Sequence, residues 1–303
     1  MATPGDSDEI LHVCGAALGW SNPDFDRALF RWKHFDNAFG PSLMLIAEDE
    51  SGILAVRPLM RWRFASAGGD VRAARAVDTA TRPDAQGRGL FRVLTQASIT
   101  HLESDGYGFI FNTPNEKSRP GYLKMGWVDA GRIGFGFGIG SPASIGRIVR
   151  SRAAADKPSI ETPNLGLSVA EGLETASTPT GSEPGLRTAH SMETLLWRYS
   201  EGPIAYRWIP TMANEGCIVR LRQRGRSREL VVAESMTAGN SAHEWKIVRD
   251  IMRQVDADYC LTPAGFGAAR TVTKLGPTLT LRSIAVNPIN STFRWSPGDI
   301  ELF

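Results

Sequence analysis

Two spacings of apolar positions recur along the chain, and they predict a series of helices and strands. Helical spacing covers residues 8–18, 24–35 and 90–102. Strands are predicted at 42–47 and 53–64, joined by the turn Asp49–Gly52, and a buried strand is predicted at 107–112. A helix at 115–125, broken or delayed by Pro120, and a strand at 127–139 follow. Residues 1–140 are therefore predicted to form one α/β unit.

The last third of the chain repeats this order in outline. Strands are predicted at 205–212, 217–223, 228–234 and 259–261, with a helix at 242–255. Leu195–Tyr199 echoes Leu29–Lys33, and Lys274-Leu275-Gly276 echoes Lys124-Met125-Gly126. We therefore predict a second lobe at residues 191–303, although two α/β units with common spacing would also give these matches.

Residues 141–190 differ in composition from both lobes. A short helix is predicted at 145–152, whereas residues 156–185 are rich in Pro, Ser, Thr and Gly and carry little periodicity. An extra strand can fit near 165–169. We interpret 141–190 as a connector that wraps over a lobe surface, with a flexible linker as the alternative.

The stretch from Ala76 to Gly89 carries the main chemical signal. It predicts a strand, a tight loop and a helix start. The backbone N–H groups of residues 86–91 would then lack strand or helix partners, at a helix end with partial positive charge. Gly87 and Gly89 permit close approach because they have no Cβ. A phosphate group is the expected ligand of such a loop.

These residues resemble the GNAT superfamily of acyl-CoA-dependent N-acyltransferases. The family's pyrophosphate loop, Gln/Arg-x-x-Gly-x-Gly/Ala, matches residues 86–91, with Phe91 where a small residue is usual. A second signature, Asn-x-x-Ala-x-x-x-Tyr-x-Lys-x-Gly-Phe, matches 115–127, with Ser118 for alanine and Trp127 for phenylalanine. The resemblance covers residues 76–127. It implies a fold of two tandem GNAT-like lobes, each a mixed twisted sheet flanked by helices, of which only the first keeps the loop.

The resemblance also implies roles for individual residues. Tyr122 would be the general acid, because a phenol is protonated at neutral pH and can donate to a leaving thiolate. Asp78 is a candidate general base, with His34, His101, His190 or a water chain as alternatives. The predicted acetyl-CoA-binding residues are Ala80, Thr81, Gln86, Gly87, Arg88, Gly89, Leu90, Phe91, Asn115 and Ser118.

Composition limits the class of protein and the partners to be expected. The chain of 303 residues has 42% hydrophobic and 22% charged residues, as expected for a globular protein, and its net charge of +2 is too small to indicate a polyanion partner. No apolar run reaches the roughly 18 residues of a membrane span. Cys14, Cys217 and Cys260 are interpreted as free thiols of a cytoplasmic protein, and no metal cluster is predicted.

Five arginines at alternating positions from Arg220 to Arg228 predict a basic sheet face. It is either a solvated, edge-protecting face or a docking site for an anionic acceptor or RNA, and the lack of interleaved aromatic residues makes nucleic acid the weaker choice. The sequence thus predicts an N-acyltransferase acting on a small-molecule or precursor amine, whose second lobe shapes the acceptor cleft. A Fem-type aminoacyl transferase and a non-catalytic acyl-CoA sensor or scaffold are the alternatives.

Overall fold

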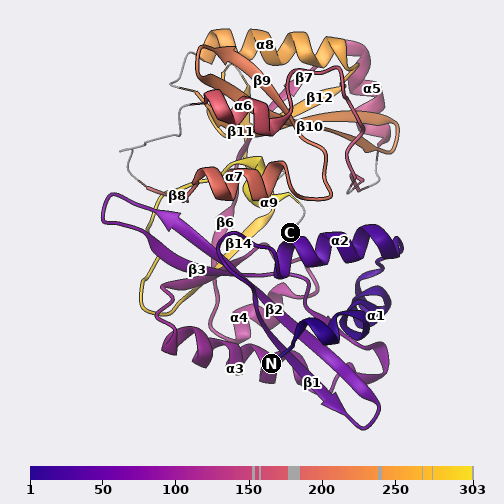
Figure 1. Ribbon diagram of the computed structural model, residues 1–303, viewed down its shortest axis with the longest axis vertical. Helices are drawn as coiled ribbons and strands as arrows, with labels where there is room; N and C mark the ends of the chain where they lie inside the picture. The colour runs from indigo at the N-terminus through magenta and orange to yellow at the C-terminus, as the bar shows by residue number, and fades with distance from the viewer. Residues whose placement is uncertain are drawn as a thin grey trace.

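The computed structural model describes residues 1–151, 154–156, 158–176, 185–237, 241–267, 269–274 and 276–301. They fold into two lobes, stacked along the long axis of the molecule (Figure 1). The described helices of the first half are η1 (Pro4–Asp6), α1 (Ser7–Leu18), α2 (Pro23–His34), η2 (Pro83–Ala85), α3 (Leu90–Ser104), α4 (Arg119–Lys124) and α5 (Pro142–Arg150). Its strands are β1 (Leu43–Asp49), β2 (Gly52–Ala65), β3 (Val71–Ala76), β4 (Ala80–Thr81), β5 (Phe109–Asn112), β6 (Val128–Arg132) and β7 (Phe135–Ile139).

The second half supplies the remaining described elements. Its helices are α6 (Val169–Thr175), α7 (Met192–Tyr199), α8 (Ser241–Gln254) and α9 (Pro297–Ile300). Its strands are β8 (Leu186–Thr188), β9 (Arg207–Met212), β10 (Glu215–Arg224), β11 (Ser227–Met236), β12 (Tyr259–Thr262), β13 (Arg270–Val272), β14 (Thr278–Ser283) and β15 (Phe293–Arg294). Most predicted elements form within a few residues of their expected bounds, and no described helix has the length and hydropathy needed to cross a bilayer.

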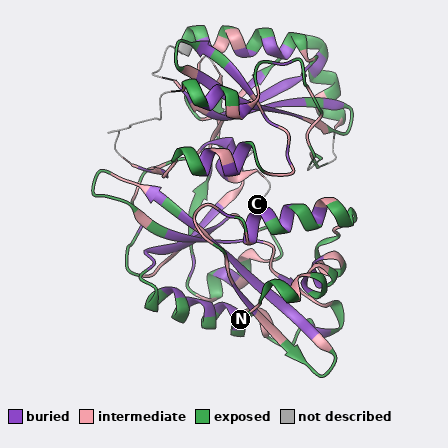
Figure 2. Cartoon of the chain, in the orientation of Figure 1, coloured by how far each residue is buried: buried purple, intermediate pink, exposed green. Residues whose placement is uncertain are grey.

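Each lobe is built on one mixed sheet. The first sheet runs β15-β8-β2-β3-β5-β14-β6, with β1 and β4 also paired to β2, and the second runs β13-β7-β12-β11-β10-β9. Many strand residues are buried, and the helices that cover the sheets turn exposed faces outward (Figure 2). The predicted class, an α/β fold of two lobes with mixed sheets flanked by helices, is therefore confirmed.

The two lobes exchange a strand. β7 pairs antiparallel with β12 and β13 in the second sheet, whereas β14 lies between β5 and β6 in the first. The single strand predicted over 127–139 is therefore wrong, because the chain leaves one sheet after β6 and enters the other at β7. β7 precedes residue 140 but belongs to the second sheet, and β14 follows residue 191 but belongs to the first. The predicted domain boundaries at 140 and 191 stay predictions.

The exchange needs a tight crossing between the strands. The N–H of Ile133 donates to the carbonyl of Pro277 at 3.0 Å, and a Cβ at Gly276 would lie 1.7 Å from the Ile133 oxygen. Gly276 comes after β13 in the sequence, and its backbone packs against the connection between β6 and β7. Its predicted equivalence with Gly126, which precedes β6, is wrong; Leu275 of that motif lies outside the described residues.

A tryptophan pair joins the lobes with near-twofold symmetry. Trp32 on α2 and Trp197 on α7 stack with ring centroids 5.1 Å apart. Each indole N–H donates to the other's backbone carbonyl, at 2.7 Å from Trp32 and 3.1 Å from Trp197. The echo predicted between Leu29–Lys33 and Leu195–Tyr199 is therefore a real structural correspondence, and the two segments meet at the lobe interface.

Two of the five arginines in the predicted basic face are covered by acidic residues, whereas Arg224, Arg226 and Arg228 are exposed. Arg220 is 1% exposed and pairs with Glu301 at 3.0 Å, while Arg222 pairs with Glu229. β10 lies between β9 and β11, so it is not an edge strand either. Neither a solvated face nor an anion-docking surface forms at these two arginines, because acidic residues distant in sequence cover them.

The strand of the connector forms later than predicted, as β8 (Leu186–Thr188), which pairs with β2 and β15. Near residues 165–169, Leu167 makes one isolated bridge to Trp208, and α6 begins at Val169 behind its cap, Ser168. Residues 177–184 of this segment lie outside the described residues. The described part lies against β9 through that bridge, in keeping with a connector that packs on a lobe.

Candidate active site

A cleft of about 880 Å³ opens in the first lobe where two parallel strands diverge. β3 pairs with β5 from Ala73 to Arg75, and beyond that point β4 pairs with β2 alone. The cleft is lined by Ala17, Leu18, Trp20, Ala76, Val77, Asp78, Thr79, Ala80, Thr81, Ala85, Gln86, Gly87, Gly89, Leu90, Phe91, Arg92, Asn112, Thr113, Pro114, Asn115, Lys117, Ser118, Gly121 and Tyr122. All these residues come from the first lobe, so the prediction that the second lobe shapes this cleft is not supported.

A bulge separates β3 from β4 and brings Asp78 to the cleft. β2 pairs with β3 as far as Leu59 opposite Ala76, and pairing resumes with Val56 opposite Ala80. Three residues, 77–79, thus oppose two, which is the definition of a β-bulge. Asp78 has φ +48°, an uncommon value for a residue with a Cβ. The sequence predicted a strand from Ala76 into the loop and missed this break.

The glycine loop has the predicted open backbone from residue 87 onward, whereas the N–H of Gln86 donates to the carbonyl of Pro83 at 3.4 Å. Gly87 and Gly89 have φ of +80° and +78°, and Gly89 caps α3, a helix of 15 residues. Within the described residues, the N–H groups of 87–91 have no backbone or side-chain acceptor. Because the loop lines the cleft, these donors are available to an anion there.

Tyr122 lies at the bottom of the same cleft. It is 4% exposed, and its hydroxyl oxygen accepts a hydrogen bond from Arg57 Nη1 at 2.6 Å. The Phe91 ring meets the Tyr122 ring edge-on, with centroids 5.2 Å apart. A Cβ at Gly121 would come within 3.0 Å of Phe91, so the unusual Phe91 in the loop is matched by a glycine on α4.

Asn115 and Ser118 line the cleft opposite the loop. The Asn115 side-chain oxygen accepts from the Ser118 N–H at 2.9 Å and hydroxyl at 3.1 Å, which fixes the turn before α4. Arg88 points elsewhere: its side chain is 53% exposed and lies 3.7 Å from Asp49, and it does not line the cleft. The cleft therefore brings together every predicted site residue except Arg88, while their roles stay predictions.

Asp78 is held by two basic residues at the end of α2. Its Oδ2 atom accepts from Lys33 Nζ and lies 3.1 Å from His34 Nε2. Lys33 and His34 are buried, whereas the Asp78 side chain keeps 13% exposure toward the cleft. Burial acts to raise the pKa of Asp78, but Lys33 and His34 outweigh it and hold that pKa well below its usual range. Burial lowers the pKa of His34, which favours a neutral imidazole.

Sequence reasoning missed Lys33 and Arg57 as parts of this site and gave His34 no positional support. The sequence contains one signal for Arg57, since it is the only charged residue in the run from Ile53 to Met60. Lys33 and His34 carry a weaker signal, because they lie on the last turn of an amphipathic helix. His101, on α3, is exposed and does not line the cleft.

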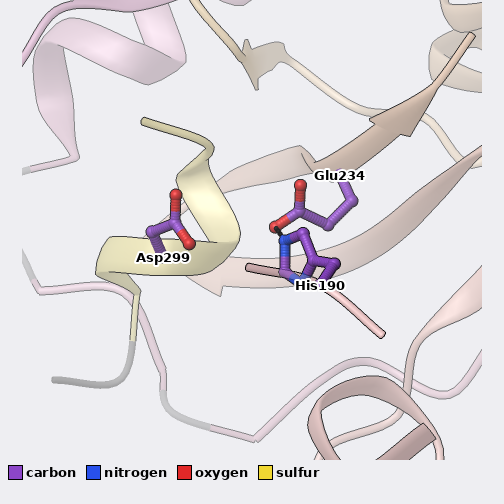
Figure 3. Close-up of side chains that lie close together, drawn as sticks. All are labelled: His190, Glu234 and Asp299. Carbon is purple, nitrogen blue, oxygen red and sulfur yellow. Dashed lines mark ion pairs between the residues drawn. The ribbon is translucent and has the colours of Figure 1, made fainter. Parts of the chain in front are cut away.

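The second lobe contains a different cluster, His190, Glu234 and Asp299 (Figure 3). The Glu234 Oε1 atom lies 3.4 Å from His190 and already accepts from the Tyr199 hydroxyl at 2.6 Å and the Ser296 hydroxyl at 2.5 Å. Three such ligand types can hold a metal ion, but here the oxygen nearest His190 is used by protein donors. We interpret the cluster as a buried hydrogen-bond network that ties α9 to β11.

The first lobe thus combines a bulged strand, a diverging parallel neighbour and an open glycine loop at a helix start, and its cleft presents N–H groups that suit an anion. In sequence, residues 1–129 match the model of the acetyltransferase (GNAT) domain. Residues 1–129 of this chain are therefore similar to GNAT acetyltransferase domains, as the two signatures predicted. No curated protein matches the chain.

Solved structures support the two-lobed fold. A probable N-acyltransferase from Enterococcus faecalis is 10% identical with a TM-score of 0.64, covering 94% of this chain and 72% of its own. Eis1 from Mycobacterium abscessus is 14% identical, with a TM-score of 0.55 and coverage of 94% and 73%. A GCN5-related N-acetyltransferase from Anabaena variabilis is 11% identical, with a TM-score of 0.56 and coverage of 93% and 71%. At these identities the likeness concerns the fold alone.

Proposed function

We propose that the protein is an acyl-CoA-dependent N-acyltransferase that uses acetyl-CoA to acylate an amine of a small molecule or precursor. The observation that carries the proposal is the open row of N–H groups at residues 87–91, in the same cleft as Tyr122. Such a row suits the pyrophosphate of CoA, and the strand edge at Ala80–Thr81 suits the pantetheine arm. The GNAT match over residues 1–129 supports the same donor.

The side chains divide the work of acyl transfer. Tyr122 would donate its proton to the departing sulfur, and the loop would fix the donor so that its thioester lies near that hydroxyl. Asp78 is exposed to the cleft and would accept a hydrogen bond from the attacking amine. Because Lys33 and His34 lower the pKa of Asp78, it is a weak base, so it orients the nitrogen more than it removes the proton.

The acceptor end of the cleft favours a compact amine. The cleft is also lined by Ala17 and Leu18 at the end of α1 and by Trp20 after it, which offer apolar surface. Among the described residues, Asp78 is the only acidic one that lines the cleft, and Lys33 balances its charge. We therefore propose an amine on an apolar or aromatic body, in place of the anionic acceptor that the arginine stretch suggested.

Calorimetry with CoA tests the proposal. Gly87→Asp together with Gly89→Asp should abolish binding, because each aspartate places negative charge against the pyrophosphate. Gly265→Asp is the matched control: Gly265 also has a positive φ, +79°, and open space around its Cα, but it lies in the second lobe. Binding by the double variant at the parent's affinity would remove the loop from the site.

Turnover separates the proposal from its alternatives. Acetyl-CoA and a panel of amines should release free thiol, and Tyr122→Phe should lower kcat by about 100-fold with CoA affinity unchanged. CoA binding without thiol release for any amine would favour the sensor or scaffold. Failure to bind CoA, with activity on charged tRNA, would favour the Fem-type aminoacyl transferase.

A further inference from the structure

Arg57 is a buried cation directly behind the cleft. It lies in the middle of β2, where all eight residues from Ile53 to Met60 are buried, and its own exposure is 0%. Its side chain reaches the bulge that separates β3 from β4, where it contacts Thr79, and Arg57 and Pro58 pair with neither of these two strands. Burying a charged side chain costs free energy, which hydrogen bonds offset only in part. A buried arginine at this position therefore calls for a role that an apolar residue could not fill.

The contacts of Arg57 point to the wall of the cleft. Nη1 donates to the Tyr122 hydroxyl at 2.6 Å and to the Thr79 hydroxyl at 2.7 Å. The guanidinium carbon lies 5.2 Å from the centre of the Tyr122 ring and 5.4 Å from that of Phe91. Nε and Nη2 have no hydrogen-bond partner among the described residues, and no described carboxylate pairs with the group. The guanidinium is therefore held mainly by the cleft residues themselves.

The direction of the Arg57–Tyr122 bond decides where the tyrosine proton points. A guanidinium has only donors, so the Tyr122 oxygen must accept this bond. The hydroxyl hydrogen of Tyr122 is then directed away from Arg57. Tyr122 lines the cleft, and the cleft is where that hydrogen finds room.

We propose that Arg57 is a positioning residue that aims the Tyr122 hydroxyl at the departing sulfur and stabilises the phenolate left behind. This inference rests on the proposed function. In the step, the amine nitrogen bonds to the carbonyl carbon and the carbon–sulfur bond breaks. The Tyr122 proton goes to the sulfur, and the proton that the nitrogen loses restores the phenol. Arg57 supplies positive charge while the oxygen is negative.

The second lobe supports a specific role for this arginine. Its strand β11 also carries a bulge, at Ala233, and the residues of β10 that flank it are Ile218 and Val219. Both are buried and apolar, so a bulge in this strand does not itself require a cation. The buried arginine next to this bulge, Arg220, pairs with Glu301 at 3.0 Å, whereas Arg57 lies at the bulge beside the cleft and has no described carboxylate partner.

Kinetics of Arg57→Met and Arg57→Lys test the proposal. Arg57→Met should lower kcat by about 10–100-fold, as expected for a lost hydrogen bond to a charged group, and leave the KM for acetyl-CoA within about twofold. Arg57→Lys should recover part of the loss because it keeps the charge, and added guanidinium ion should restore turnover to Arg57→Ala. The same rescue should fail when Tyr122→Phe is also present.

The double variant and a control make the outcomes distinct. Arg57→Met with Tyr122→Phe should be no slower than Tyr122→Phe alone, because the arginine acts through the tyrosine. Arg75→Met removes another arginine of 0% exposure, outside the cleft, and should lower the melting temperature while kcat stays unchanged.

A full rate in Arg57→Met, or further loss in the double variant, overturns the proposal. A full rate in Tyr122→Phe instead overturns the acid role on which it rests. If Arg57→Met does not fold, the Lys variant and the guanidinium rescue still decide.

Discussion

Each lobe places a carboxylate in or next to the bulge of a strand, and the two lobes surround it differently. In the first lobe Asp78 lies in the bulge after β3, against Lys33 and His34 of α2, and faces the cleft. In the second lobe Glu234 lies beside the bulge of β11, against Tyr199 of α7. The Trp32–Trp197 pair relates the two helices, so the comparison is between equivalent places.

The difference lies in what closes over each carboxylate. Asp78 retains access to an 880 Å³ cleft, whereas Glu234 is covered by Ser296 and by α9, which carries Asp299. The sequence predicts that the connection from β11 to α8 lacks the glycine loop of the first lobe. Part of that connection, residues 238–240, lies outside the described residues. The same frame thus supports an accessible site in one lobe and a sealed network in the other.

Removing each carboxylate should separate activity from stability. Asp78→Asn should lower turnover by about 100-fold, because the amine loses a charged acceptor, and should destabilise the fold by about 3–5 kcal/mol because Lys33 loses its charged partner. Glu234→Gln should cost about 1–3 kcal/mol and leave kcat unchanged. Steady-state kinetics and urea unfolding measure both. Equal loss of turnover in the two variants would mean that the sealed network belongs to the active site.

The symmetric tryptophans should be equally important. Trp32→Ala and Trp197→Ala should each cost about 3–5 kcal/mol, because both side chains are buried at the lobe interface. Trp32→Phe and Trp197→Phe keep the aromatic contact and should cost about 1 kcal/mol each, the value of the lost N–H bond. Thermal unfolding of the four variants tests this. A large difference between the alanine variants would contradict the near-twofold interface.

Where the exchanged strands cross, the structure should accept a glycine-to-alanine substitution at Gly134 but not at Gly276. A Cβ at Gly276 would meet the Ile133 backbone oxygen at 1.7 Å, whereas a Cβ at Gly134 would meet a Thr273 methyl group at 3.1 Å. Gly276→Ala should therefore cost about 3 kcal/mol and Gly134→Ala no more than about 1 kcal/mol. Chemical denaturation gives both values. If Gly276→Ala were neutral, the crossing would be looser than the structure shows.

Local patterns explain why so much of the first lobe was predictable. The Asn22 cap, the helical spacing of α2 and α3, and the paired glycines at 87 and 89 act over a few residues, so the sequence contains them directly. The cleft residues follow, because the loop and the α4 signature each face the point where β3 and β5 diverge. This part of the site needed no knowledge of the second lobe.

Long-range pairing explains what the sequence did not reveal. Residues 127–139 look like one strand, and the break at Ile133 depends on Pro277, which is distant in the chain. Arg220 and Arg222 alternate as an exposed face would, yet Glu301 reaches them from the C-terminal segment. A charge pattern gives no information about a partner so far away, and the burial of these arginines follows only from the fold.

Two histidines extend the comparison, with opposite effects of pH. Burial lowers the pKa of His34, whereas Glu234 outweighs burial and raises that of His190. The unfolded chain therefore binds the His34 proton more readily, and stability from His34 falls as the pH drops below about 6.5. His190 binds its proton more tightly when folded, so its contribution is full below about 6.5 and is lost as the pH rises through its folded pKa.

Stability against pH should show these two signs, with a slope of at most about 1.4 kcal/mol per pH unit for one proton. His34→Gln should flatten the acid side of the curve relative to the parent, and His190→Gln should flatten the neutral to alkaline side. Urea unfolding at a series of pH values measures both curves. If stability still falls at low pH in His34→Gln, or if both substitutions change the pH curve in the same way, the prediction is wrong. The histidines beside Asp78 and beside Glu234 would then not differ in charge.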